Sequence, residues 1–255
     1  RKELDTAKAD SVHKPIFVFQ HPHPFATVYG SINWGDTTIK KVLSDYPQVI
    51  DFSGHSHYSP SDPRSVWQGS FTAVGCGSLA AFMGNLNYID GDKDAPGNSG
   101  GYWIVEVDEK GNTLLRLFDA ENRCFFDNVN YYFSDISDVS SRNYCWHRQR
   151  SLDTKPVFPE NAEISYDRDK DGNIILKFPD AAGFYEAENY KIIIKSSDGR
   201  LVFAETVISD YVRSGHKGVT VNISKKLYGS HIIQINTYSP YAKKGGKLYN
   251  TLDFK

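Results

Sequence analysis

The sequence predicts an α/β domain over residues 1–152, followed by an all-β sandwich domain over residues 153–255. Two observations carry this prediction. In the first part, two short apolar runs are separated by an amphipathic helical segment, which is the strand–helix–strand order of a parallel pair of strands. In the second part, short alternating segments follow one another closely, with turn residues between them and no helix-length periodicity.

The first elements follow from apolar spacing. A helix is predicted over Glu3–Val12, where apolar residues recur at helical intervals. Pro15–Gln20 is short, apolar, β-branched and aromatic, which is typical of a buried strand. Thr38–Tyr46 has an apolar helical face and is ended by Pro47. Gln48–Phe52 is a second buried strand, and we expect it to lie parallel and adjacent to the first.

The remainder of the first domain contains a further strand and a hairpin. Ser70–Val74 is the predicted strand. Tyr102–Val107 and Thr113–Asp119 alternate in polarity and flank the turn Asp108–Asn112, which indicates a hairpin. From about Asn122 to Leu152 the sequence is aromatic and polar without clean periodicity. We interpret this stretch as the end of the domain and the linker.

The second domain is predicted from closely spaced strands with glycine-containing turns, such as Asp171-Gly172 and Asp198-Gly199. About seven strands in roughly 100 residues are typical of an immunoglobulin-like or fibronectin type III-like sandwich. The predicted strands are Ile164–Tyr166, Ile174–Phe178, Tyr190–Lys195, Leu201–Ile208, Val219–Ile223, His231–Thr237 and Lys247–Phe254.

Composition narrows the functional classes. The formal net charge is −2, which gives no general attraction to nucleic acid, and no apolar run approaches the 18 residues of a membrane span. The cysteines Cys76, Cys124 and Cys145 form no C-x-x-C pair. We expect three reduced, buried thiols, with a Cys124–Cys145 bridge as the alternative. The sequence leaves the localisation open, and a secreted or cell-envelope-associated protein is among the alternatives.

Three histidines follow the two apolar strands. His21 ends the first strand, and His55 and His57 follow the second in the sequence Gly-His-Ser-His. Ligands gather at the carboxyl ends of parallel strands, and a buried strand holds its terminal residue rigidly. Neutral imidazole binds Zn, Fe, Mn or Ni much better than Ca or Mg. The pattern therefore predicts a transition-metal site.

Two blocks of this sequence resemble a known family. Phe17–His21, a hydrophobic strand ending in histidine, and Gly54–His57, with its Gly-His-x-His, resemble the last two sequence blocks of the calcineurin-like metallophosphoesterase superfamily. Thr72–Leu79 resembles the segment that closes the second sheet of that domain. The resemblance covers about residues 1–120. It implies the C-terminal half of a four-layer αββα sandwich.

The resemblance also implies roles for the histidines. His21 and His55 would bind one metal, and His57 would bind a second. The cofactors would be two divalent transition metals, chosen from Mn, Fe, Zn and Ni, and the reaction would be hydrolysis of a phosphomonoester or phosphodiester.

Further residues near these histidines are candidates for the substrate pocket. We predict that Tyr29, Ser31 and Tyr58 line it. His23, in His-Pro-His-Pro, is a further candidate, with an alternative metal ligand or an ordinary loop histidine as the other interpretations.

The sequence departs from the family in its missing blocks. It contains no Asp-x-His and no Asn-His, and Gly35-Asp36 and Gly91-Asp92 both follow His21, in the wrong order for the family. About half of the ligands, including the bridging carboxylate, are therefore absent. We expect a missing N-terminal half of the same domain to supply them, and this chain alone to be inactive. The rival hypothesis is a non-catalytic binding or adhesion module. Its sandwich domain would take a carbohydrate or cell-envelope ligand, with the histidines as a remnant or a structural metal site.

Two acidic segments suggest other cation sites. Asp167–Ile174 resembles the start of an EF-hand loop, but its twelfth position is Phe178 where a bidentate glutamate is needed. We predict a hairpin turn there and leave weak calcium binding open. Asp90, Asp92 and Asp94 are interpreted as a solvated turn, with a metal role as the alternative.

Overall fold

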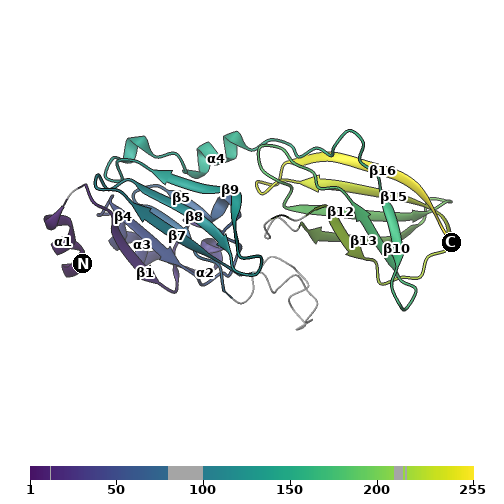
Figure 1. The fold of residues 1–255 in the computed structure, drawn as a ribbon, viewed down its shortest axis with the longest axis horizontal. Coiled ribbons are helices and arrows are strands. Elements are labelled where there is room, and N and C mark those ends of the chain that lie inside the picture. The colour runs from purple at the N-terminus through teal and green to yellow at the C-terminus, as the bar shows by residue number, and fades with distance from the viewer. Residues whose placement is uncertain (12, 80–99, 210–214, 216) are drawn as a thin grey trace. The chain divides into compact units, whose positions relative to one another are not determined.

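A computed structural model of the chain describes residues 1–11, 13–79, 100–209, 215 and 217–255 (Figure 1). The described chain divides into two compact units between Arg150 and Ser151, which we call the N-terminal and C-terminal units. The predicted boundary after residue 152 lies two residues from this division. Strands outnumber helices, so the protein is a β-rich α/β protein. No helix among the described residues is long and apolar enough to cross a membrane.

The main sheet of the N-terminal unit has the strand order β1-β4-β6-β5. The strands β1 (Ile16–Gln20), β4 (Val49–Ser53) and β6 (Thr72–Gly75) are parallel, and β5 (Val66–Gln68) runs antiparallel at one edge. The prediction that the two apolar strands are parallel neighbours is confirmed, because β1 pairs with β4 along its whole length.

A second, antiparallel sheet packs against the first. It consists of β7 (Gly101–Val107), β8 (Thr113–Asp119) and β9 (Cys124–Phe133). Figure 1 shows these strands lying over the parallel sheet. The core between the sheets is formed by buried residues of both, together with Ile136, which follows β9: Ile50, Phe52, Val66, Val74, Leu115, Tyr131, Phe133 and Ile136.

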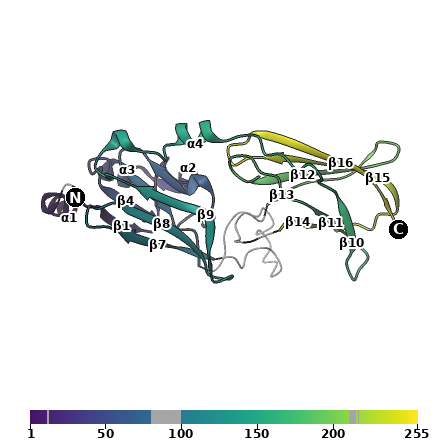
Figure 2. The same cartoon turned by 45° about the horizontal axis from the view of Figure 1, so that its top comes forward.

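Helix α3 (Thr37–Leu43) covers the other face of the parallel sheet. Its Leu43 packs in one buried cluster with Val49 and Ala73, whose side chains leave that face. The described part of the unit therefore has three layers, α, β and β (Figure 2). The fourth, helical layer of the expected αββα arrangement is not among the described residues. The other helices of the described residues are α1 (Lys2–Asp10), α2 (Ser31–Trp34), α4 (Trp146–Leu152), η1 (Pro63–Ser65) and η4 (Val139–Ser141).

The C-terminal unit contains two antiparallel sheets with the strand orders β10-β11-β14 and β13-β12-β15-β16. Both sheets contribute to one core, in which Leu176, Ile192 and Ile233 have no exposed surface. Each predicted strand is present: β10 (Ser165–Arg168), β11 (Ile174–Phe178), β12 (Asn189–Ser196), β13 (Leu201–Ile208), β14 (Val219–Asn222), β15 (Gly229–Tyr238) and β16 (Lys244–Phe254).

Two of the sequence predictions about local chemistry are settled by this fold. The loop before β11 is a hairpin turn, in which the Asp169 carboxylate accepts hydrogen bonds from the backbone of Asp171 (2.9 Å) and Asn173 (2.8 Å). None of the three cysteines forms a disulfide, as expected, but the expectation that they are buried is wrong, since Cys124 is exposed and the other two are partly exposed. The acidic loop containing Asp90 lies outside the described residues.

Candidate metal centre and its surroundings

The site lies where β1 and β4 end. The two strands are paired up to Gln20 and Ser53, so the residues that follow them emerge at the same edge of the sheet. The backbone oxygen of His21 accepts hydrogen bonds from the backbone N–H groups of Gly54 (3.3 Å) and His55 (3.0 Å). These bonds hold the Gly-His-Ser-His turn against the end of β1.

The rings of His21 and His55 meet at this edge. Nε2 of His21 lies 2.9 Å from Nδ1 of His55, and both side chains are exposed to solvent. The ring planes are nearly perpendicular, at 86°, with centroids 4.8 Å apart. In the chain itself this contact is a hydrogen bond between two imidazoles. The spacing is also close to that of two ligands of one cation, because nitrogens about 2.1 Å from an ion are about 3 Å apart at right angles and about 3.4 Å apart in a tetrahedral site.

His57 occupies a separate position. It is exposed, and its φ of 54° is in the left-handed region, which is uncommon for a residue other than glycine. Its backbone N–H donates to the oxygen of Gly54 at 3.1 Å, which closes the turn. No cluster of three or more potential metal-binding side chains occurs in the described ranges. The structure thus brings two of the three predicted ligands together and keeps the third apart.

His23 is part of the framework beneath this turn. It has no exposed surface, its Nδ1 lies 2.8 Å from Ser53 Oγ, and its Nε2 accepts a hydrogen bond from the Ser56 backbone N–H at 3.0 Å. Because Nε2 is an acceptor, Nδ1 carries the proton and donates to Ser53. Burial, with the neighbouring His55 and His21, lowers the pKa of His23 to about 4. The ring is therefore neutral near pH 7 and joins the end of β4 to the turn.

The chain between the two histidine blocks is folded back on itself. The short strands β2 (His23–Pro24) and β3 (Gly35–Asp36) pair in parallel, and α2 lies between them. The Asp36 side chain then caps α3 by accepting a hydrogen bond from the Ile39 backbone at 2.8 Å. This arrangement fixes Trp34, the last residue of α2, beside the turn.

Three aromatic side chains extend from the histidine pair, and we call them the aromatic row: Trp34, Tyr58 and Tyr29. The rings of Tyr29 and Tyr58 stack with centroids 3.9 Å apart and planes at 13°. Trp34 is tilted against Tyr58 at 6.0 Å, and its centroid lies 6.3 Å from that of His55. Both tyrosines predicted to line the pocket therefore belong to this row, with Tyr58 between Trp34 and Tyr29. Trp34 was not predicted.

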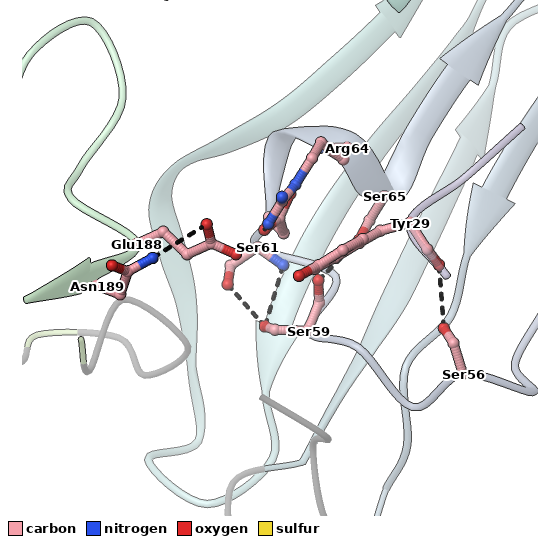
Figure 3. Close-up of polar contacts among 9 residues, drawn as sticks. Tyr29, Ser56, Ser59, Ser61, Arg64, Ser65, Glu188 and Asn189 are labelled. Atoms are coloured by element: carbon pink, nitrogen blue, oxygen red, sulfur yellow. Dashed lines mark hydrogen bonds and ion pairs between the residues drawn. The ribbon is translucent and has the colours of Figure 1, made fainter. Parts of the chain in front are cut away.

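Arg64 covers the far end of the aromatic row. Its guanidinium carbon is 3.6 Å from the centroid of the Tyr29 ring, and Figure 3 shows the two side chains lying against each other. The same guanidinium binds both carboxylate oxygens of Asp62, at 2.8 and 2.5 Å, and Asp62 has no exposed surface. A two-bond pair with a buried carboxylate gives Arg64 one orientation.

Gly30 allows the turn to pack against α2. Its φ is +85°, and a Cβ atom there would lie 2.7 Å from Cβ of Ser56 and 2.8 Å from the Tyr58 ring. Both distances are shorter than any van der Waals contact permits, so only glycine fits. The Ser56 hydroxyl also donates to the backbone oxygen of Tyr29 at 3.2 Å, as drawn in Figure 3.

Asp51 is a buried carboxyl within β4. Its Oδ1 accepts a hydrogen bond from Gln20 at 2.5 Å, whereas its Oδ2 is buried without a hydrogen-bond partner. Burial raises the pKa of Asp51 to about 7, against the opposing effect of hydrogen bonds from Gln20 and Ser53. Gln20 is the last residue of β1 and Ser53 is the last residue of β4. The hydrogen bonds of Asp51 therefore connect the two strand ends that carry the site.

The sequence was also compared with known proteins. No protein-family model and no curated protein matches it. The case for the site therefore depends on its own residues: a pair of imidazole nitrogens in contact, a neutral buried histidine below them, and an ordered row of aromatic rings beside them.

Proposed function

We propose that this chain supplies part of the active site of a metal-dependent phosphoesterase, in which His21 and His55 bind one divalent transition ion. The observation that carries the proposal is the 2.9 Å contact between their ring nitrogens at the ends of two parallel strands. The position is rigid and exposed, as a metal site open to a substrate requires. The resemblance of both histidine blocks to metallophosphoesterases supplies the reaction class.

Each residue of the chain has a distinct task in this proposal. A bound transition ion supplies Lewis-acid charge beside the phosphoryl group. His21 and His55 hold that ion, and His57 is available to a second one. His23 keeps the turn in place and stays neutral, so it adds no positive charge next to the ion. The remaining ligands, including a carboxylate, come from a further segment of the same domain.

The edge strand β1 supports the idea of a further segment. Its Phe17 and Phe19 point to the side of the sheet that carries the inter-sheet core, yet they are 38% and 75% exposed. Within the described residues β1 pairs only with β4, so its other edge offers backbone groups for another strand. Exposed phenylalanines on an unpaired edge are unusual in a finished sheet. A strand added there would cover them.

We further propose that the C-terminal unit is an immunoglobulin-like or fibronectin type III-like domain. Its three-stranded and four-stranded sheets around one core support this assignment. A carbohydrate or cell-envelope ligand for this unit stays a prediction.

Turnover is the test of the proposed function. Hydrolysis of p-nitrophenyl phosphate and of bis(p-nitrophenyl) phosphate is measured with Mn²⁺ or Zn²⁺, for this chain and for the longest product of its gene. We expect turnover by the product that contains the remaining ligands, and its loss in His21→Ala. His147→Ala, which changes an exposed histidine in α4, serves as the control and retains activity. If the longest product neither binds metal nor hydrolyses these esters, the proposal is contradicted and the non-catalytic binding module is favoured.

A further inference from the structure

The aromatic row has one covered end and one open end. At the covered end, the Arg64 guanidinium lies over Tyr29. At the open end, Trp34 is 37% exposed although it is a large apolar side chain. This exposed indole stands directly beside the histidine pair, since its centroid is 6.3 Å from that of His55. An exposed aromatic surface next to a candidate catalytic site is suited to binding part of a substrate.

The surroundings of Trp34 are already ordered in the chain. The Tyr29 backbone N–H donates to the Arg64 backbone oxygen at 3.0 Å, and the Trp34 backbone N–H donates to the Gly30 oxygen at 3.1 Å. Arg64 itself is fixed by the buried Asp62. A ligand that stacks on Trp34 therefore has few side chains to order, which favours binding.

We propose that Trp34 is a stacking platform for a planar ring on the alcohol side of the phosphate ester. This inference rests on the proposed function, because the phosphoryl group is taken to lie at His21 and His55. Aromatic rings stack with centroids about 4.5–7 Å apart, and the centroid of His55 lies at a similar distance, 6.3 Å, from that of Trp34. One small molecule can therefore reach both places. Aryl phosphates and nucleoside monophosphates have this shape, whereas glycerol phosphate has no ring to stack.

Ligand titrations of the full chain test the platform. Binding of AMP, phenyl phosphate and glycerol 3-phosphate is measured by calorimetry in the presence of Mn²⁺. We expect both ring-bearing esters to bind more tightly than glycerol 3-phosphate, and Trp34→Ala to weaken their binding roughly tenfold, the usual effect of losing one stacked aromatic ring. Comparison of AMP with phenyl phosphate shows whether the platform prefers a nucleobase or a simple aryl ring.

Two control variants separate stacking from folding. Trp34→Phe keeps an aromatic ring and is expected to retain most of the affinity. Trp146→Ala removes a tryptophan of matched exposure, 36%, from α4 and is expected to bind as the unmodified chain does. Circular dichroism of each variant checks that the fold is retained.

The outcomes distinguish this inference from the proposed function. Equal affinity of the three esters, no loss in Trp34→Ala, or no binding of either ring-bearing ester overturns the platform. If Mn²⁺ binding depends on His21 while ester binding is indifferent to Trp34, the platform fails and the metal site stands. Adenosine, which has the ring but no phosphate, is titrated as well. If adenosine binds in a way that depends on Trp34 while the chain binds no metal, the ring site is supported and the phosphoesterase proposal fails.

Discussion

Replacement of Asp51 by asparagine gives a quantitative test of the framework below the site. Burial raises the pKa of this carboxyl from its ordinary 3.8 to about 7. In the folded chain the group is therefore neutral below pH 7, whereas in the unfolded chain it ionises above pH 4. Between these values the folded state binds more protons, so the free energy of unfolding falls as pH rises. A shift of about three units corresponds to a loss of about 4 kcal/mol, complete above pH 7.

The asparagine side chain in the Asp51→Asn variant has the same shape as aspartate and no charge. The variant keeps an oxygen that accepts from Gln20 and presents an amide where Oδ2 is buried without a partner, which costs a constant amount at every pH. The difference in unfolding free energy between Asp51→Asn and the unmodified chain is therefore expected to rise in favour of the variant by several kcal/mol from pH 4.5 to 8. Other titrating groups cancel in this difference.

Urea denaturation followed by tryptophan fluorescence measures this difference cleanly. All four tryptophans of the chain lie in the N-terminal unit, so the signal reports that unit alone. Asp127→Asn changes an exposed carboxyl in β9 of the same unit and is expected to give a flat difference curve. A flat curve for Asp51→Asn as well would refute the reasoning, because it would mean that burial does not perturb the group.

Three further predictions concern the site and the edge strand. Gly30→Ala is expected to lower the melting temperature more than Gly199→Ala. Both glycines have a φ near +85°, but a Cβ atom would meet neighbouring atoms only at Gly30. Equal melting temperatures of the two variants in calorimetry would contradict this. His23→Ala removes the acceptor of the buried Ser56 N–H and one of the hydrogen bonds of the buried Ser53 hydroxyl, and should cost the N-terminal unit about 2 kcal/mol in urea denaturation. An unchanged midpoint would contradict this. Phe19→Thr removes an exposed ring and should reduce binding of the dye ANS without loss of stability; unchanged dye binding would show that Phe19 is already covered.

The meeting of His21 and His55 could be predicted because it depends on local signals. Two short apolar runs joined through a helix give parallel neighbours, and the residues after such strands emerge together. The C-terminal strands were predictable for a similar reason, since period-two alternation and glycine turns mark each one.

The elements that were not predicted lack such signals. Strand β9 lies in the stretch that was interpreted as irregular because its sequence has no clean periodicity. In the structure its burial does not alternate regularly, and its pairing with β8 shifts register between Arg116 and Phe118. Helix α4, with the sequence WHRQRSL, has a single buried residue, Gln149, and no apolar face. Both are stabilised by contacts with other elements, and the local periodicity of a sequence does not show such contacts.

The parts of the site that escaped prediction depend on contacts between distant residues. His23 stands between two prolines and has the sequence of an exposed loop, yet its ring bonds to Ser53 and Ser56, which lie 30 and 33 residues away. Trp34 is placed beside His55 by the pairing of β2 with β3, which joins only two residues of each strand. The one available signal was an isolated tryptophan in the loop after a candidate ligand.

The most direct test of the central claim is a zinc titration of the full chain, monitored through the imidazole ¹⁵N resonances in NMR spectra. We expect one equivalent of Zn²⁺ to shift Nε2 of His21 and Nδ1 of His55 together, while both nitrogens of His23 keep their positions. Zinc that leaves the His21 and His55 resonances unchanged, or that binds only at other histidines, would contradict a shared metal site at these strand ends.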